Sequence, residues 1–116
     1  MEIIDEAKNI VLIGLMGSGK SAVGRTVAKK LARRFIDTDR LIERRGGKTI
    51  PEIFEFEGDE SFRNYEKEVI KKVSQYVGIV IATGGGAIKD PENFKNLKAC
   101  GWIIALNASP DVLFKR

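Results

Sequence analysis

The sequence contains no histidine and only one cysteine, Cys100, among its 116 residues. The absence of histidine excludes catalysis by an imidazole, and a single thiol leaves no residue set for a structural zinc site. One cysteine cannot form an internal disulfide, which favours a cytoplasmic protein. Aromatic residues make up only 8% of the chain, and no apolar run approaches the roughly 20 residues of a transmembrane helix.

Strong charge of one sign is also lacking, because 20 basic residues face 16 acidic ones, a net charge of +4. A mildly basic balance is compatible with nucleic acid, an anionic surface or a polyanionic small molecule. The basic residues occur as short pairs such as Arg33-Arg34, Arg44-Arg45 and Lys71-Lys72, which is typical of solvated helix faces. Residues 1–9 contain three acids and no apolar run, unlike a secretory signal. We therefore expect neither nucleic acid nor a membrane as the partner.

Short apolar, β-branched runs predict four strands, near residues 10–13, 34–37, 79–82 and 102–106. Apolar residues three and four apart predict helices between them. One follows Gly19, and a short one begins at Leu41-Ile42 and ends at Gly46-Gly47. Strands that alternate with helices predict a single α/β domain over residues 1–116, with a doubly wound parallel sheet between two helix layers. Ligands of such folds bind at the carboxyl ends of the strands.

The second half of the sequence contains further helix signals. Thr49 and Glu52 form a capping-box pattern that opens a brief helix, and Gly58 should break it. A long amphipathic helix is expected over residues 60–76, ended by Gly78. Asp90-Pro91 should begin another, with Phe94 and Leu97 on its inner face. Ser109-Pro110-Asp111 is a last helix start with only five residues after it, so we expect a C-terminally truncated chain.

The strongest functional signal is the run Gly14-Leu-Met-Gly-Ser-Gly-Lys-Ser21 between a predicted strand and a predicted helix. Glycines let successive backbone N–H groups face phosphate oxygens, the lysine reaches the β- and γ-phosphates, and the serine hydroxyl ligates Mg²⁺. A chance glycine-rich turn is the alternative, and the flanking elements argue against it. The residues expected to bind ATP are Gly14, Met16, Gly17, Ser18, Gly19, Lys20, Ser21 and Ala22. Kinases, GTPases, motor ATPases and helicases all share this loop, so the second substrate must be inferred from other residues.

Two carboxylates follow the second predicted strand. Asp37 and Asp39 lie two residues apart, and in an extended chain their side chains point to the same side. One could hold Mg²⁺ while the other accepts a hydrogen bond from a substrate hydroxyl, although Asp39 could instead cap the next helix. Gly84, Gly85 and Gly86 could admit a ligand close to the backbone, or form an ordinary loop. Arg63 could pair with a carboxylate, or be a solvated surface residue.

These motifs together resemble shikimate kinase. The matching segments run in order along nearly the whole chain: residues 14–21, Phe35-Ile-Asp-Thr-Asp-Arg-Leu-Ile-Glu43, Gly58-Asp-Glu-Ser-Phe-Arg63 and Ala82-Thr-Gly-Gly-Gly-Ala87. The resemblance implies a nucleoside-monophosphate-kinase-like P-loop fold. It also implies ATP- and Mg²⁺-dependent phosphorylation of the 3-hydroxyl of shikimate, on the route to chorismate and the aromatic amino acids.

The resemblance also assigns roles to individual residues. Lys20 and Asp39 match the catalytic positions, and Asp39 also binds the shikimate hydroxyls. Ser21 and Asp37 match the Mg²⁺ positions, and Arg116 matches an arginine that lies against adenine. Arg63 and the middle glycine, Gly85, match positions that hold the shikimate carboxylate and ring. We expect Gly84 and Gly86, on either side of Gly85, to belong to the same substrate-binding segment.

The sequence departs from the family at its carboxyl end, where members continue with a mobile lid, a further shikimate-binding arginine and a last strand. We therefore expect a monomer that a further C-terminal segment would complete. Two alternatives stay open at this point: a non-catalytic nucleotide- or shikimate-binding module, and a kinase for another small polyol such as gluconate.

Overall fold

The computed structural model describes residues 7–14 and 20–106. Four strands form one parallel sheet: β1 (Asn9–Gly14), β2 (Phe35–Asp37), β3 (Val80–Ala82) and β4 (Gly101–Leu106). Their order across the sheet is β2-β3-β1-β4, so the chain crosses from β1 to the far edge, returns to β3, and then passes to the other side of β1. All four predicted strands are confirmed, each with bounds shifted by a residue at most at either end.

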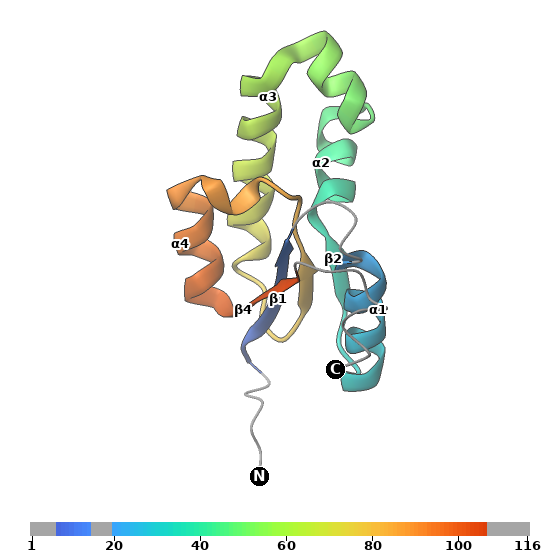
Figure 1. Cartoon of the computed structure of the whole chain (residues 1–116), viewed down its shortest axis with the longest axis vertical. Coiled ribbons are helices and arrows are strands. Elements are labelled where there is room, and N and C mark those ends of the chain that lie inside the picture. Colours follow the sequence, from blue (N-terminus) through green and yellow to red (C-terminus); the bar gives the residue numbers. More distant parts are fainter. Residues whose placement is uncertain (1–6, 15–19, 107–116) are drawn as a thin grey trace.

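The helices are α1 (Lys20–Leu31), α2 (Thr38–Gly46), α3 (Ile50–Val73) and α4 (Pro91–Cys100), with a short 3₁₀ turn, η1 (Ala87–Lys89), between β3 and α4. Figure 1 shows α1 on one side of the sheet and α3 and α4 on the other. The expected three-layer α/β/α architecture is therefore confirmed. Among the described residues, no helix combines the length and the apolar character needed to cross a bilayer.

Each strand of the sheet contributes side chains to two separate apolar cores, because successive side chains point to opposite faces. In β1, Val11 and Ile13 pack with α2, α3 and α4, whereas Ile10 and Leu12 pack with Ala28 of α1. The strand is consequently buried on both faces, as in other parallel sheets. Its amino end is fixed by buried Asn9, whose side-chain amide donates to the Tyr76 carbonyl and accepts from the Ile79 N–H.

An arm made of α2 and α3 extends beyond the sheet (Figure 1). The predicted capping box is present, since Thr49 and Glu52 each accept a hydrogen bond from the other's backbone. Gly58 lies inside α3 with φ +91° and ψ 172°, so the helix kinks there as the sequence predicts. The two helices expected on either side of Gly58 are thus halves of one kinked element.

Three expectations about helix bounds and faces are wrong. Helix α2 begins at Thr38, three residues before the predicted start, because the Asp37 side chain caps it. Helix α3 ends at Val73 and not at residue 76, because Ser74 closes its last turn. Phe94 of α4 is 39% exposed; Asn93 takes the inner position beside Leu97 because its amide bonds the Ala87 carbonyl of η1.

Candidate active site

Apart from Arg63 on α3, the predicted site residues that the structure describes lie at or just after the carboxyl ends of three adjacent strands. Lys20 and Ser21 begin the helix that follows β1, Asp37 ends β2, and the Gly84–Gly86 segment follows β3. Because β2, β3 and β1 are neighbours and run parallel, their carboxyl ends lie side by side at the same end of the sheet. The doubly wound topology therefore brings together motifs that lie as many as 70 residues apart in the sequence.

Lys20 is directed back toward the end of β1, where its ammonium group donates to the Gly14 carbonyl at 2.8 Å. Burial lowers the pKa of Lys20, while the carboxylates of Asp39 and Asp37 act in the opposite direction and favour its charged form. The cation thus lies within electrostatic reach of both predicted acids. Gly14 itself leaves no room for a side chain, since a Cβ there would meet the Leu106 carbonyl oxygen of β4.

Ser21 and Asp37, the two residues expected to serve Mg²⁺, are in direct contact. The Ser21 hydroxyl donates to Asp37 Oδ2 at 2.9 Å, and Asp37 Oδ1 accepts from the backbone N–H of Asp39. Hydroxyl and carboxylate oxygens are the ligands that Mg²⁺ prefers, so this pair fits that cation. In the described part of the chain no group of three or more His, Cys, Asp or Glu could hold a metal, so phosphate oxygens or water would have to complete its coordination.

Asp39 occupies the first turn of α2, and the helix cap is Asp37. The alternative that Asp39 caps the helix is therefore wrong, and so is the premise that both acids lie on an extended strand. Burial raises the pKa of Asp39 to about 6, and the negative charges of Asp37 and Glu66 act in the same direction. The positive charge of Lys20 lowers this pKa, but it offsets the other effects only in part. The result is a carboxyl group that titrates close to neutral pH.

Arg63 forms an ion pair with Glu66, one helical turn further along α3, at 2.8 Å between Nη1 and Oε1. Glu66 is only 1% exposed, and burial raises its pKa against the influence of Arg63. Arg63 remains half exposed, with 46% of its side chain accessible. A buried carboxylate thus holds Nη1 of a guanidinium group whose side chain is otherwise half exposed.

The sequence reasoning did not identify Glu66. A detectable signal existed, because Glu66 follows Phe62 by four residues and precedes Val69 and Ile70 by three and four. It therefore falls on the apolar face of the predicted helix. A charged residue at such a position is rarely buried without a partner.

The glycine segment lies against the two predicted substrate-binding side chains. A Cβ on Gly84 would stand 2.8 Å from Asp39 Oδ1, and a Cβ on Gly86 would stand 3.0 Å from Arg63 Nη2. Side chains at these two positions would crowd Asp39 and Arg63, so the glycines let the backbone lie close to both groups. Gly85, between them, is exposed. The Asn93 side-chain amide donates a hydrogen bond to the carbonyl of Ala87, the residue that directly follows the segment.

Some predicted residues lie outside the described part of the chain: Met16, Gly17, Ser18, Gly19 and Arg116. Ala22 is exposed in the first turn of α1. The described site thus consists of a lysine, two aspartates, a serine, an arginine–glutamate pair and a glycine segment. An arrangement of this kind can neutralise phosphate charge, hold a divalent cation through oxygen atoms and accept a proton from an alcohol.

Comparison with known proteins identifies close relatives. The family model for shikimate kinase matches residues 16–116. A shikimate kinase of Symbiobacterium thermophilum is 51% identical over 93% of this chain and 62% of its own length. The solved structure of a shikimate kinase from Acinetobacter baumannii in complex with shikimate aligns with a TM-score of 0.86 and 43% identity, over 95% of this chain and 62% of that one. The chain thus spans about three fifths of the length of these relatives.

A gluconokinase structure from Sinorhizobium meliloti aligns less closely, with a TM-score of 0.56 and 19% identity, over 97% of this chain and 64% of that one. At this level of identity the likeness extends to the fold alone.

Proposed function

Because this chain belongs to the shikimate kinase family, we propose that it is the nucleotide- and shikimate-binding part of an enzyme that transfers the γ-phosphoryl group of ATP to the 3-hydroxyl of shikimate. One observation carries the proposal beyond family membership. The Asp39 carboxylate, the Lys20 ammonium and the half-open Arg63 guanidinium converge where β1, β2 and β3 end. These groups supply a proton acceptor, a phosphate partner and a carboxylate partner, as the reaction requires.

In the proposed complex, Arg63 binds the shikimate carboxylate with the guanidinium edge that Glu66 does not occupy. The Glu66 contact restricts the arginine before substrate arrives, which lowers the entropy lost on binding. Gly84, Gly85 and Gly86 let the ring approach the backbone closely. Asp39 accepts hydrogen bonds from the ring hydroxyls, and this fixes the 3-hydroxyl relative to the phosphate.

The chemical step moves one proton and one phosphoryl group. The 3-hydroxyl oxygen forms a bond to the γ-phosphorus, its proton passes to the Asp39 carboxylate, and the bond from that phosphorus to the β–γ bridging oxygen breaks. The products are shikimate 3-phosphate and ADP. An Asp39 pKa of about 6 leaves the group mainly ionised at pH 7, yet basic enough to take a proton in the transition state.

Lys20 neutralises charge on the β- and γ-phosphates during this transfer, at the cost of its hydrogen bond to the Gly14 carbonyl. We assign Mg²⁺ to the Ser21 hydroxyl and the Asp37 carboxylate; when bound, the cation would offset the negative charge of the triphosphate. The P-loop residues Gly14 to Ala22 and the adenine contact of Arg116 belong to the same proposal. We further propose a monomeric single P-loop kinase domain that acts in the cytoplasm.

The test is titration calorimetry of the 116-residue chain with ATP and Mg²⁺, and separately with shikimate, followed by a phosphoryl-transfer assay. We expect saturable binding of both ligands, and abolition of shikimate binding by Arg63→Ala with little loss of ATP binding. Absence of shikimate binding in a folded chain that still binds ATP would refute the substrate assignment. Addition of gluconate as a competitor separates shikimate from other small polyols.

Binding of ATP and shikimate without catalysis is the second candidate function. A chain that binds both ligands but forms no shikimate 3-phosphate would select it.

A further inference from the structure

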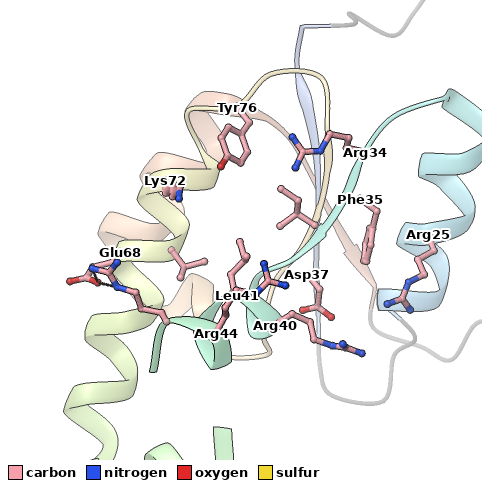
Figure 2. Close-up of a pocket in the computed structure, with 13 residues that line it drawn as sticks. Arg25, Arg34, Phe35, Asp37, Arg40, Leu41, Arg44, Glu68, Lys72 and Tyr76 are labelled. Atoms are coloured by element: carbon pink, nitrogen blue, oxygen red, sulfur yellow. Dashed lines mark hydrogen bonds and ion pairs between the residues drawn. The ribbon is translucent and has the colours of Figure 1, made fainter. Parts of the chain in front are cut away.

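A basic groove lies beside β2 and adjoins the candidate active site at Asp37, which lines both. It has a volume of about 780 Å³. Figure 2 shows side chains of α1, α2 and α3 around it. All three residues of β2 also line it. We call it the β2 groove and define it by its six basic residues, Arg25, Arg34, Arg40, Arg44, Arg45 and Lys72.

The residues that line the β2 groove account for the whole net positive charge of the chain. Its lining has six basic residues and two acidic ones, Asp37 and Glu68, so the 14 basic and 14 acidic residues elsewhere in the sequence cancel. Both acids are already engaged, Asp37 with the Ser21 hydroxyl and Glu68 with Arg45 at 2.9 Å. The basic pairs that looked like solvated helix faces in the sequence therefore point in part into one concave surface.

Five of the six cations form no ion pair with any residue that the structure describes: Arg25, Arg34, Arg40, Arg44 and Lys72. Two of them lie over aromatic rings, Arg25 at 5.3 Å from the centroid of Phe35 and Arg34 at 5.8 Å from that of Tyr76. Figure 2 shows the five cations on different sides of the groove and not gathered at one point. Such a distribution fits an elongated partner with several separated negative charges better than a compact anion.

The backbone of β2 supplies a second kind of recognition. Among the strands that the structure describes, β2 is at the edge of the sheet and pairs only with β3. The Arg34 carbonyl accepts from the Val80 N–H at 2.9 Å, so the alternation of a parallel strand turns the backbone N–H and C=O of Phe35 away from β3, toward the groove. Apolar side chains, including Leu41 and Val69, line the same space. An extended peptide could therefore pair with this edge.

We propose that the β2 groove binds an acidic segment of another protein in extended conformation, as an added strand beside β2. The free edge provides main-chain hydrogen bonds, and the cations on both faces of the sheet receive the alternating side chains of the peptide. Sheet edges are also commonly guarded by basic side chains that prevent pairing. Because like charges repel, such guarding works against neutral or basic strands, whereas an acidic strand is attracted.

The probe is a capped peptide of about eight alternating Glu and Thr residues, long enough to pass the edge of β2. Binding to the 116-residue chain is measured by calorimetry. We expect the Arg44→Glu/Lys72→Glu double variant to weaken binding about tenfold or more, because it reverses two groove charges. The matched control is Lys95→Glu/Lys98→Glu on α4, which makes the same charge change outside the groove and should shift affinity less than twofold.

Hydrogen exchange followed by NMR separates strand addition from attraction by charge alone. The bound peptide should slow exchange of the Phe35 amide, whereas the Ile36 amide, which faces β3, should change little. Inorganic polyphosphate is the probe for charge alone, and it should leave the Phe35 amide unchanged. The proposal is overturned if the peptide does not bind, or if it binds without protection of Phe35. Equal weakening by the two double variants would likewise exclude the groove as its site.

Discussion

Two charged regions flank β2, and they differ in how their charges are balanced. At the carboxyl end of the strand, Lys20 is near Asp37 and Asp39, and Arg63 is paired with Glu66. Along the edge of the same strand, five cations of the β2 groove have no acidic partner in the described part of the chain. Balanced charges suit a site whose side chains are held in place before a small ligand arrives. Unbalanced charges suit attraction of a larger, flexible partner.

The largest effect is expected from Lys20. Lys20→Ala should reduce ATP affinity about a hundredfold, because it removes the cation proposed to neutralise the β- and γ-phosphates from a partly buried site. Lys29→Ala, at the exposed end of the same helix, is the matched control and should have almost no effect. Calorimetric titration with ATP and Mg²⁺ measures both. An affinity of the Lys20 variant within threefold of the parent would contradict the assigned role.

Two glycines offer a contrast between binding and stability. Gly84→Ala should weaken shikimate binding about tenfold, since its Cβ displaces the Asp39 carboxylate from which it would be only 2.8 Å. Gly47→Ala has open space around its Cβ but a φ of +69°, so it should cost about 1 kcal/mol of folding stability and leave shikimate binding unchanged. Calorimetry and thermal unfolding of both variants test the contrast. The same loss of affinity in both would remove the steric explanation.

The elevated pKa of Asp39 predicts a pH-dependent stability. The folded-state pKa of about 6 lies above the ordinary value of 3.8, so the folded chain binds more protons within this window and loses stability as the pH rises through it. Asp39→Asn removes the buried charge. Above pH 6, the Tm of the variant should be a few degrees higher than that of the parent. Near pH 3, the two Tm values should be equal. A Tm difference that stays constant across this range would show that the carboxylate is not destabilised by burial.

The smallest effect is expected on the binding of ATP and shikimate when only the charge of the β2 groove is changed. Arg44→Glu changes the charge of the β2 groove but touches none of the proposed ATP or shikimate contacts. Affinities for both ligands should therefore stay within about twofold of the parent at 0.15 M salt, where exposed charges are screened over roughly 8 Å. A large change in either would mean that the groove and the active site act as one electrostatic unit.

Much of the candidate site could be predicted from the sequence because its motifs are local. The glycine-lysine-serine run needs only a strand before it and a helix after it, and Gly58 and the Thr49–Glu52 capping box act over a few residues. Asp39 shows the limit of such reasoning. Its nearness to Asp37 was expected for the wrong reason, since the structure places it in a helix whose start is set by the Asp37 side chain.

The β2 groove lay beyond sequence reasoning because its basic residues come from separate parts of the chain. They belong to α1 (Arg25), the segment before β2 (Arg34), α2 (Arg44) and α3 (Lys72), and no spacing within the chain relates them. Each one, taken alone, looks like a solvated surface residue. The same holds for the closeness of Gly84 and Asp39, which brings a residue after β3 next to one in the first turn of α2.

The sequence alone determined the order of strands and helices, the phosphate-binding motif and the family, because periodicity and short motifs depend on neighbouring residues. Only the tertiary structure decided which charges are compensated, which acid is partly protonated near neutral pH and which strand edge is open. Those properties depend on burial and on partners distant in the chain, and the packing of the sheet brings them together.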